Sequence, residues 1–270
     1  MKKKINIDKN TAINLYTIHQ NINIVAKELN CDRTTLWRRL HSWGIKVKKS
    51  KHEGFDQYYF HDINTEAKAY FFGLLMADGN NYTKQYRIVL SLAESDEEII
   101  HKFKKELKTP AEVKVNKSYK NTHQDRKYLQ INSKIMSNRL SEIGCVNNKS
   151  TILQFPKNII PDHLTHHFIR GVFDGDGSIS TSVNNKGWKY HVFNITGNLD
   201  FLIGIQDLLI QNCKINKTKL NSPKRYKNGT SMLVYGGAGN IAKIGEWLYK
   251  DATFFLDRKK DKIYSIIKHI

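Results

Sequence analysis

Two aspartates, each followed by a glycine, close two similar passages of this sequence. Asp78 stands near the end of the passage 69–79, and Asp176 stands at the same place in the passage 167–177, 98 residues further along. Both passages are apolar and long enough for a helix. Because Gly79 and Gly177 suit the left-handed position just past a helix end, we expect both carboxylates to lie at helix C-termini.

Small residues recur in both passages at a spacing of four. They are Gly73 and Ala77 in the first passage and Gly171 and Gly175 in the second. Residues four apart lie on one face of a helix, and a stripe of small side chains lets another backbone approach closely. The two predicted helices can therefore pack together, which would bring Asp78 and Asp176 toward each other.

Two carboxylates held together suggest a site for a divalent cation. They repel each other, and the negative ends of the two helix dipoles add to that repulsion unless a cation intervenes. Hard oxygen donors suit Mg²⁺, or another divalent cation such as Mn²⁺. We therefore expect Asp78 and Asp176 as metal ligands, with Ala77 and Gly175 as further ligand residues. Such ions polarise a phosphate and activate water, which is the chemistry of phosphodiester hydrolysis.

The segments around the two passages have the periodicities of strands and helices. In the first copy, alternation predicts strands at 87–92, 112–118 and 127–132, and helical spacing predicts helices at 96–107 and 134–143. In the second copy we expect strands at 188–196, 217–222 and 231–235, and helices at 199–210 and 240–249. With a further strand expected directly after each passage, each copy runs helix, strand, strand, helix, strand, strand, helix, so the fold class is α+β.

The polar faces of these strands are candidate nucleic-acid contacts. A sheet with one apolar face under helices and one polar face can read base edges in a major groove. The candidates are Arg87, Ser91, Lys114, Asn116, Ser118, Gln130 and Asn132 in the first copy, and Lys189, Lys217, Lys219 and Arg225 in the second.

The composition points to a polyanionic partner. The 270 residues include 44 lysines and arginines against 25 aspartates and glutamates, a formal net charge of +19. Nucleic acid is the natural partner for such a charge. The sequence contains no apolar run of transmembrane length and no signal peptide, so we expect no membrane association.

The three cysteines, Cys31, Cys145 and Cys213, form no metal-binding or disulfide pattern. A reducing compartment is therefore expected: the cytoplasm of a bacterial or phage-infected cell, or a compartment that holds an organelle genome.

The N-terminal region 1–46 has the spacing of a helix-turn-helix DNA-binding domain. We expect helices at 24–29 and 33–41, with Asp32 as N-cap of the second helix and with Leu36, Trp37 and Leu40 facing inward. The outward candidates for DNA contact are Arg33, Thr34, Thr35 and Arg38. The alternative is a solvated basic helical hairpin. A basic and aromatic linker at 47–64, expected to follow a phosphate backbone, would join this domain to the rest.

At the two passages the sequence resembles the LAGLIDADG homing endonucleases, in their single-chain form with two motifs. The matching stretches read FFGLLMADG at 71–79 and IRGVFDGDG at 169–177. The resemblance implies two pseudo-symmetric αββαββα subdomains, at 65–160 and 161–270, that form a DNA-binding saddle. It also implies a monomer with one active site per DNA strand, which cuts double-stranded DNA at a long target site to leave short 3′ overhangs and so serves intron homing.

The resemblance implies further a basic residue near each catalytic aspartate. Lys149 and Lys259 stand where the family places it, with Arg258 and Lys260 as alternatives to Lys259. In one respect the first motif departs from the pattern: Met76 occupies the position that Asp174 keeps in the second motif. Weaker activity is therefore expected first at the Asp78 site. Two other functions fit the same fold: a DNA-binding regulator without catalysis, and a maturase that acts on intron RNA.

Overall fold

The computed structural model describes residues 7–47, 55–117, 125–147, 152–221 and 230–270. Contacts divide the chain into two compact units, Met1–Glu53 and Gly54–Ile270. Each unit has an apolar core of its own. None of the helices in the described ranges is long and apolar enough to cross a membrane.

The first unit consists of three short helices, α1 Lys9–His19, α2 Ile22–Glu28 and α3 Arg33–Ser42. The two predicted helices are present as α2 and α3, and α1 was not expected. Asp32 is the N-cap of α3, because its Oδ1 accepts hydrogen bonds from the backbone N–H groups of Thr34 (2.8 Å) and Thr35 (3.2 Å).

The prediction that Trp37 faces inward is wrong. Its side chain is 42% exposed and stacks on the ring of His41, with the ring centroids 5.0 Å apart. Leu36 and Leu40 already fill the core side of α3. Trp37 and His41, also four residues apart, lie together on the neighbouring stripe of the helix.

The second unit is built from helices and antiparallel strands. Its helices are α4 Glu66–Ala77, α5 Glu97–Glu106, α6 Lys134–Glu142, α7 Thr165–Asp176, α8 Leu199–Cys213, α9 Ala238–Leu248 and α10 Asp257–Ile267, with short 3-10 turns η1 Thr83–Gln85, η2 Glu94–Asp96 and η4 Asp162–Leu164. Its strands are β1 Gly79–Tyr82, β2 Arg87–Ala93, β3 Val113–Asn116, β4 Arg126–Asn132, β5 Gly177–Val183, β6 Lys189–Asn198 and β7 Thr230–Gly236. The predicted α+β class is confirmed.

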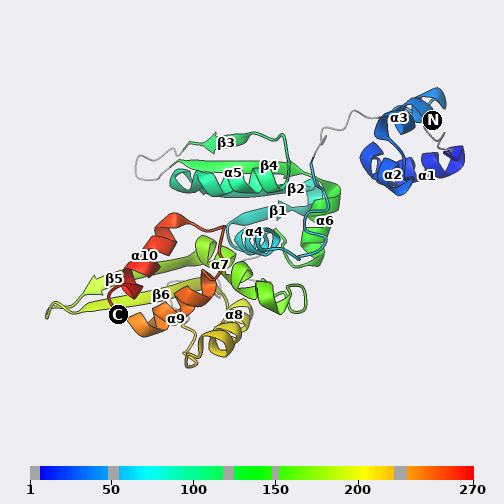
Figure 1. Cartoon of the computed structure of the whole chain (residues 1–270). Helices are drawn as coiled ribbons and strands as arrows, with labels where there is room; N and C mark the ends of the chain where they lie inside the picture. The colour runs from blue at the N-terminus through cyan, green and yellow to red at the C-terminus, as the bar shows by residue number, and fades with distance from the viewer. Residues whose placement is uncertain (1–6, 48–54, 118–124, 148–151, 222–229) are drawn as a thin grey trace. The chain divides into compact units, whose positions relative to one another are not determined.

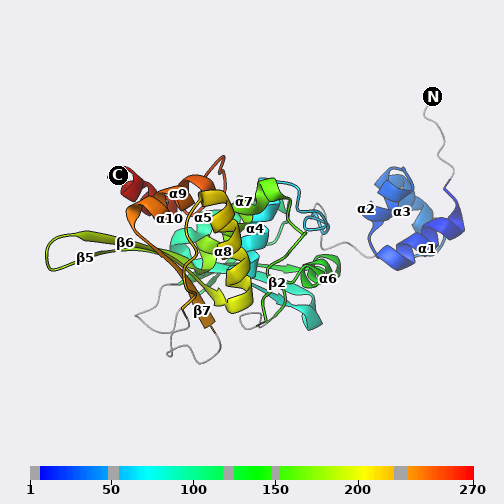
Figure 2. The same ribbon diagram turned by 90° about the horizontal axis from the view of Figure 1, so that it is seen from below.

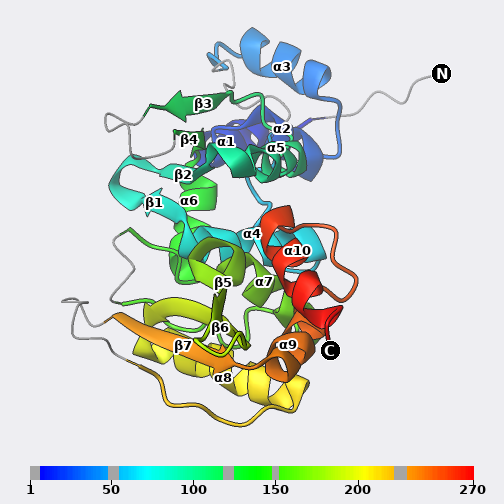
Figure 3. The same cartoon turned by 90° about the vertical axis from the view of Figure 1, so that its left-hand side faces the viewer.

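The strands form two sheets, one in each half of this unit. The first sheet has the order β1-β2-β4-β3 and the second β5-β6-β7, and all neighbours in both are antiparallel. Figure 3 shows the sheets on either side of the central pair α4 and α7. The strand predicted at 217–222 appears among its described residues only as a single bridge between Asn221 and Met232.

The aromatic half of the predicted linker lies in the core of the second unit and does not follow a phosphate backbone. Phe55, Tyr59, Phe60 and Ile63 are all buried there, and Phe60 packs against Phe72 of α4. Four large apolar side chains are more stable buried than in a solvated linker, which explains the difference.

Helices α4 and α7 pack backbone against backbone, as their small-residue stripes predicted. A Cβ atom built on Gly73 would lie 2.1 Å from the carbonyl oxygen of Phe168, and one built on Gly171 would lie 2.1 Å from that of Tyr70. Only glycine fits at these two positions, so the spacing between the helices is set by the sequence.

Gly79 and Gly177 do not take the left-handed conformation that we expected. Neither glycine is among the described residues with positive φ, and Gly177 is extended, with φ −95° and ψ 164°. The chain instead turns straight from each helix into a strand. A Cβ on Gly79 would lie 2.6 Å from the carbonyl oxygen of Leu75, and one on Gly177 would lie 2.6 Å from that of Phe173. These glycines are needed for close approach to the last helical turn.

Candidate active site and nucleic-acid interface

The ends of α4 and α7 lie side by side, so the residues around Asp78 and Asp176 come together. A Cβ on Gly175 would lie 2.3 Å from the Cβ of Ala77 and 3.3 Å from Oδ2 of Asp78. The structure therefore brings together all four predicted metal-ligand residues. Asp176 is exposed and Asp78 is half-buried, so the two carboxylates have unequal surroundings.

An arginine that the sequence did not single out stands beside Asp78. Nη2 of Arg126 lies 3.8 Å from Oδ1 of Asp78, and the same guanidinium donates to the hydroxyl (3.2 Å) and the carbonyl oxygen (2.5 Å) of Ser91. Arg126 begins β4 and is one residue outside the strand that alternation predicted. Extending that alternation by one residue would have placed it on the polar face.

Lys259 of α10 is hydrogen-bonded to the C-terminal end of α7. Its side chain is 4% exposed, and Nζ donates to the carbonyl oxygens of Phe173 (2.6 Å), Asp174 (2.6 Å) and Gly177 (2.7 Å). Burial lowers the pKa of Lys259 to about 8. A cation here also offsets the negative end of the helix dipole next to Asp176. Lys149, its predicted counterpart in the first half, lies outside the described residues.

Asp174, two residues before Asp176, links α7 to α4 and to the start of α10 by hydrogen bonds. Its Oδ2 accepts hydrogen bonds from the hydroxyl of Tyr70 on α4 (2.8 Å) and the backbone N–H of Leu256 before α10 (2.9 Å). Burial raises the pKa of Asp174 to about 6. At the matching position of α4, Met76 is buried among apolar side chains. The two halves therefore differ in the support of their helix ends.

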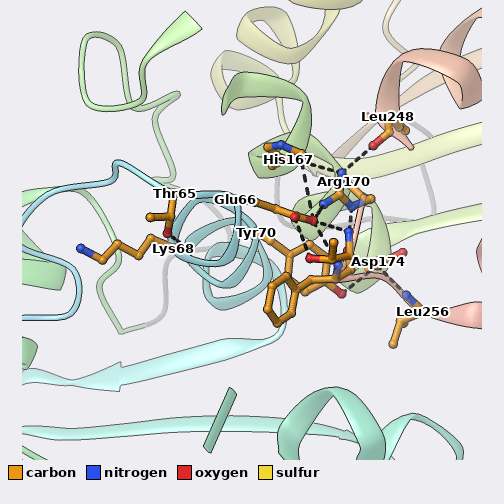
Figure 4. Close-up of polar contacts among 11 residues, drawn as sticks. Thr65, Glu66, Lys68, Tyr70, His167, Arg170, Asp174, Leu248 and Leu256 are labelled. Atoms are coloured by element: carbon orange, nitrogen blue, oxygen red, sulfur yellow. Dashed lines mark hydrogen bonds and ion pairs between the residues drawn. The ribbon is translucent and has the colours of Figure 1, made fainter. Parts of the chain in front are cut away.

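A second cluster fixes the opposite end of the helix pair (Figure 4). The buried guanidinium of Arg170 on α7 donates to Glu66 Oε1 on α4 (2.7 Å) and to the carbonyl oxygens of Leu248 (2.6 Å) and Phe254 (2.7 Å). Glu66 also accepts from the backbone N–H (2.6 Å) and hydroxyl (2.7 Å) of Thr253. Because the buried guanidinium and the carboxylate bond to each other and to groups of both neighbouring segments, this network holds α4, α7 and the segment before α10 in one arrangement.

An ion pair across the two halves lies close to the candidate site. Arg258 of α10 donates to both carboxylate oxygens of Asp96 at η2, at 2.8 to 3.2 Å. The hydrogen bonds to Asp96 raise the pKa of Arg258. Asp96 is buried, so this contact also fixes where Arg258 stands, next to Lys259.

The side chains of the candidate site can supply only part of the ligand shell of a hard divalent cation. Within the described ranges, no cluster of three or more His, Cys, Asp or Glu side chains could hold a metal ion. Two carboxylates with nearby backbone carbonyls suit Mg²⁺, which commonly takes one or two protein carboxylates and completes its shell with water and substrate phosphate. The residues present therefore fit a metal that is held jointly by the protein and a nucleic acid.

The first sheet carries its predicted polar residues on one face. Strand register pairs Arg87 with Asn132, Ser91 with Tyr128 and Asn116 with Arg126, and Lys114 and Gln130 follow the same alternation. The other face carries Ile88, Leu90, Leu129 and Ile131, which are buried. Tyr128 also lies on the polar face and was not predicted. Ser118 lies outside the described residues.

The second sheet differs from its prediction. Lys189 shares a face with Ile179 and Phe193, so the basic face expected there does not include it. Lys217 and Lys219 are exposed in a segment without strand structure, and Arg225 lies outside the described residues. The face turned away from the core is formed by Ser178, Ser180, Ser182, Tyr190, Val192, Asn194, Thr196, Met232 and Val234. For Lys189 the difference follows from strand parity, which charge alone does not reveal.

In the first unit, the predicted DNA contacts lie along the start of α3. Arg33, Thr34 and Arg38 are exposed, and Thr35 is half-buried. The N-terminal part of α3 therefore presents mostly exposed polar side chains, as a recognition helix does.

Comparisons with known proteins agree with this geometry. Residues 165–246 match the family model of the LAGLIDADG-like domain. A search of curated protein sequences found no match.

Among solved structures, the chain is similar to the I-SmaMI LAGLIDADG homing endonuclease bound to cleaved DNA, with a TM-score of 0.52, 11% identity, and coverage of 77% of this chain and 89% of that one. It is also similar to I-GzeII in complex with a DNA target, with a TM-score of 0.51, 12% identity, and coverage of 74% and 88%. Residues 165–246 thus form a LAGLIDADG-like domain, and the second unit as a whole, with two motif helices and two sheets, has the LAGLIDADG endonuclease fold.

Proposed function

We propose that this chain is a site-specific DNA endonuclease that hydrolyses phosphodiester bonds in both strands with a divalent metal. The observation that carries the proposal is the contact between the ends of α4 and α7, which places Asp78 next to Gly175, the residue that precedes Asp176. The similar solved structures are endonucleases bound to DNA, which supports the same partner for this chain.

Asp78 and Asp176, with backbone oxygens of Ala77 and Gly175, would hold the metal. When bound, such an ion polarises the scissile phosphate and lowers the pKa of the attacking water. The carboxylates position the phosphate between the two helix ends. Because DNA has two strands and the site has two carboxylates in pseudo-symmetric positions, each carboxylate serves one strand.

Basic groups around the site would bind and position the DNA. Arg126 beside Asp78 can meet a phosphate oxygen, and Arg258 is held at a fixed place by Asp96. Lys259 has its three donors on backbone carbonyls, so we assign it a positioning role at the end of α7. The polar face of the first sheet then reads base edges with Arg87, Gln130 and Asn132.

The cutting proposal is tested with a pool of duplexes that contain randomised sequence. In Mg²⁺ the protein should cut a specific subset on both strands, and chelation of the metal should stop the cutting while the same subset is still bound. Asp207→Asn, which changes an exposed carboxylate on α8, is the control and should cut like the wild type. Specific binding without any cutting in Mg²⁺ or Mn²⁺ would instead favour a DNA-binding regulator.

We propose that α3 of the first unit adds a separate DNA contact. Replacing Arg33 and Arg38 together with Ala should lower the slope of log affinity against log salt by about 2, since each phosphate contact contributes about one. Lys27→Ala, an exposed charge on α2, is the matched control. An unchanged salt slope in the double variant would show that these arginines of α3 do not contact the DNA.

A further inference from the structure

The first half has a buried asparagine at a place where the second half has an isoleucine. Asn81 is the third residue of β1 and Ile179 is the third residue of β5, so each lies three residues beyond a motif aspartate. Both side chains are buried, and Asn81 is 0% exposed. Burial of an amide costs free energy unless its polar atoms find partners. The amide of Asn81 therefore depends on the partners that it meets in the core.

All the polar atoms of the Asn81 side chain are hydrogen-bonded. Its Nδ2 donates to the carbonyl oxygens of Ser137 (2.9 Å) and Cys145 (2.9 Å), and at longer range to the hydroxyl of Ser141 (3.2 Å). Its Oδ1 accepts a hydrogen bond from the hydroxyl of Ser137 (2.7 Å). These partners belong to α6 and to the turn that follows it. Because hydrogen bonds are directional, they fix the orientation of β1 against α6, which the non-directional apolar contacts of an isoleucine do not.

The turn after α6 also contacts the last turn of α4. The thiol of Cys145 donates a weak hydrogen bond to the carbonyl oxygen of Leu75 (3.7 Å), and a Cβ built on Gly144 would lie 3.8 Å from Cε of Met76. Helix α6 contacts β1 and β2 as well; Figure 1 shows it beside the first sheet, and Figure 2 shows the same pair from below. The end of α6 thus meets both elements that flank Asp78, namely α4 and β1.

The second half holds the corresponding helix end by a different group. There Asp174, two residues before the motif aspartate, bonds to the backbone N–H of Leu256 at the start of α10. Met76 occupies that position in α4 and is buried among apolar side chains. Each half therefore has one buried polar side chain that connects the surroundings of its aspartate to a later helix. In the first half this side chain lies on the strand after the aspartate, and in the second half on the helix before it.

We propose that Asn81 is a positioning residue for Asp78. Asp78 is the C-cap of α4 and directly precedes β1, so the direction of its carboxylate depends on the angle at which the chain leaves the helix. Asn81 sets that angle by fixing β1 against α6. This inference rests on the proposed function, because it assigns Asn81 to the cutting of one DNA strand.

The test uses the full-length protein and a duplex enriched by binding from a randomised pool, with a different label on each strand. Cutting of each strand is followed separately in Mg²⁺, and Asp78→Asn identifies the strand that the first site serves. Asn81→Ala should slow that strand roughly tenfold to a hundredfold, as a shift of about 1 Å does, and should leave the other strand at its wild-type rate. The affinity in Ca²⁺ should stay unchanged, because the Asn81 side chain is buried and does not contact the DNA.

Three further variants separate positioning from stability. Leu107→Ala is the matched control, because it truncates a fully buried side chain in the core of the same half, just after α5. It should lower the melting temperature and leave the ratio of the two strand rates unchanged. Asp174→Ala should slow the opposite strand. Ser137→Ala removes only the hydrogen bond to Oδ1 of Asn81 and should bias cutting in the same direction as Asn81→Ala by a smaller factor; its strand ratio decides the test where Asn81→Ala does not fold.

Equal slowing of both strands in Asn81→Ala, or in Ser137→Ala where that variant decides, would show a role in stability alone and overturn the proposal. Unchanged rates on both strands, or slowing of the strand that Asp78→Asn leaves intact, would also overturn it. All of these results leave the endonuclease proposal standing, because the wild type still cuts. If the wild type cuts neither strand, the proposed function fails and the role of Asn81 fails with it.

Discussion

Gly73→Ala is expected to force α4 and α7 apart. The new Cβ would lie 2.1 Å from the carbonyl oxygen of Phe168 and 3.1 Å from the backbone nitrogen of Val172. Ordinary contact begins at 3.4 Å. The two backbones must therefore separate by about 1.3 Å, and no side-chain rotation can relieve the contact, because its atoms belong to the main chain.

The magnitude follows from two opposing effects. Alanine gains about 1 kcal/mol over glycine in a helix interior. Overpacking against a rigid neighbour costs roughly 3 kcal/mol or more, at the upper end of its usual range. We expect a net loss of about 2 kcal/mol, which for a unit of this size lowers the melting temperature by about 4 to 8 °C. A shift of about 1 Å between the helix ends should also slow DNA cutting by about a hundredfold.

Thermal unfolding followed by circular dichroism measures the effect. Gly239→Ala is the matched control, because that glycine lies in helix α9 with nothing within 4 Å of the added Cβ. Its melting temperature should equal or slightly exceed that of the wild type. If Gly73→Ala is as stable as Gly239→Ala, the close approach of the motif helices does not set their spacing, and the reasoning is refuted.

Two further predictions concern the buried networks. Because burial raises the folded-state pKa of Asp174 to about 6, the stability it contributes is complete below about pH 4 and is lost as the pH rises through about 6. The stability of the wild type relative to Asp174→Asn should thus fall by roughly 1 to 3 kcal/mol between about pH 4 and pH 7 in chemical denaturation. A pH-independent difference would contradict this. Glu66→Ala leaves the buried guanidinium of Arg170 without its carboxylate and should cost about 3 to 5 kcal/mol in the same assay; a loss below about 1 kcal/mol, the scale of a surface ion pair, would show that the pair adds little.

Much of the fold followed from the sequence because local periodicity and helix capping are strong. Alternation predicted β2 at 87–92, and the strand is Arg87–Ala93. The small residues of α4 and α7 predicted their packing. Asp32 predicted the start of α3, since a capping carboxylate acts within three residues of its own position.

The features that the local sequence pattern did not predict depend on residues that are distant in the sequence. The run at the start of α10 is almost entirely charged, and Lys259 is nevertheless buried, because three carbonyl oxygens 82 to 86 residues away accept its hydrogen bonds. Arg170 and Glu66 are 104 residues apart and meet only when the motif helices pack. Lys189 was assigned by its charge, and strand parity turned it to the other face.

Paired carboxylate variants test the central claim most directly. Asp78→Asn and Asp176→Asn, combined in one chain, should leave the fold, the affinity and the footprint on enriched duplexes nearly unchanged, because both substitutions are isosteric and neither side chain is in the core. Cutting of those duplexes in Mg²⁺ should fall at least a hundredfold. Cutting at the wild-type rate by this double variant would contradict the assignment of the two carboxylates to the active site.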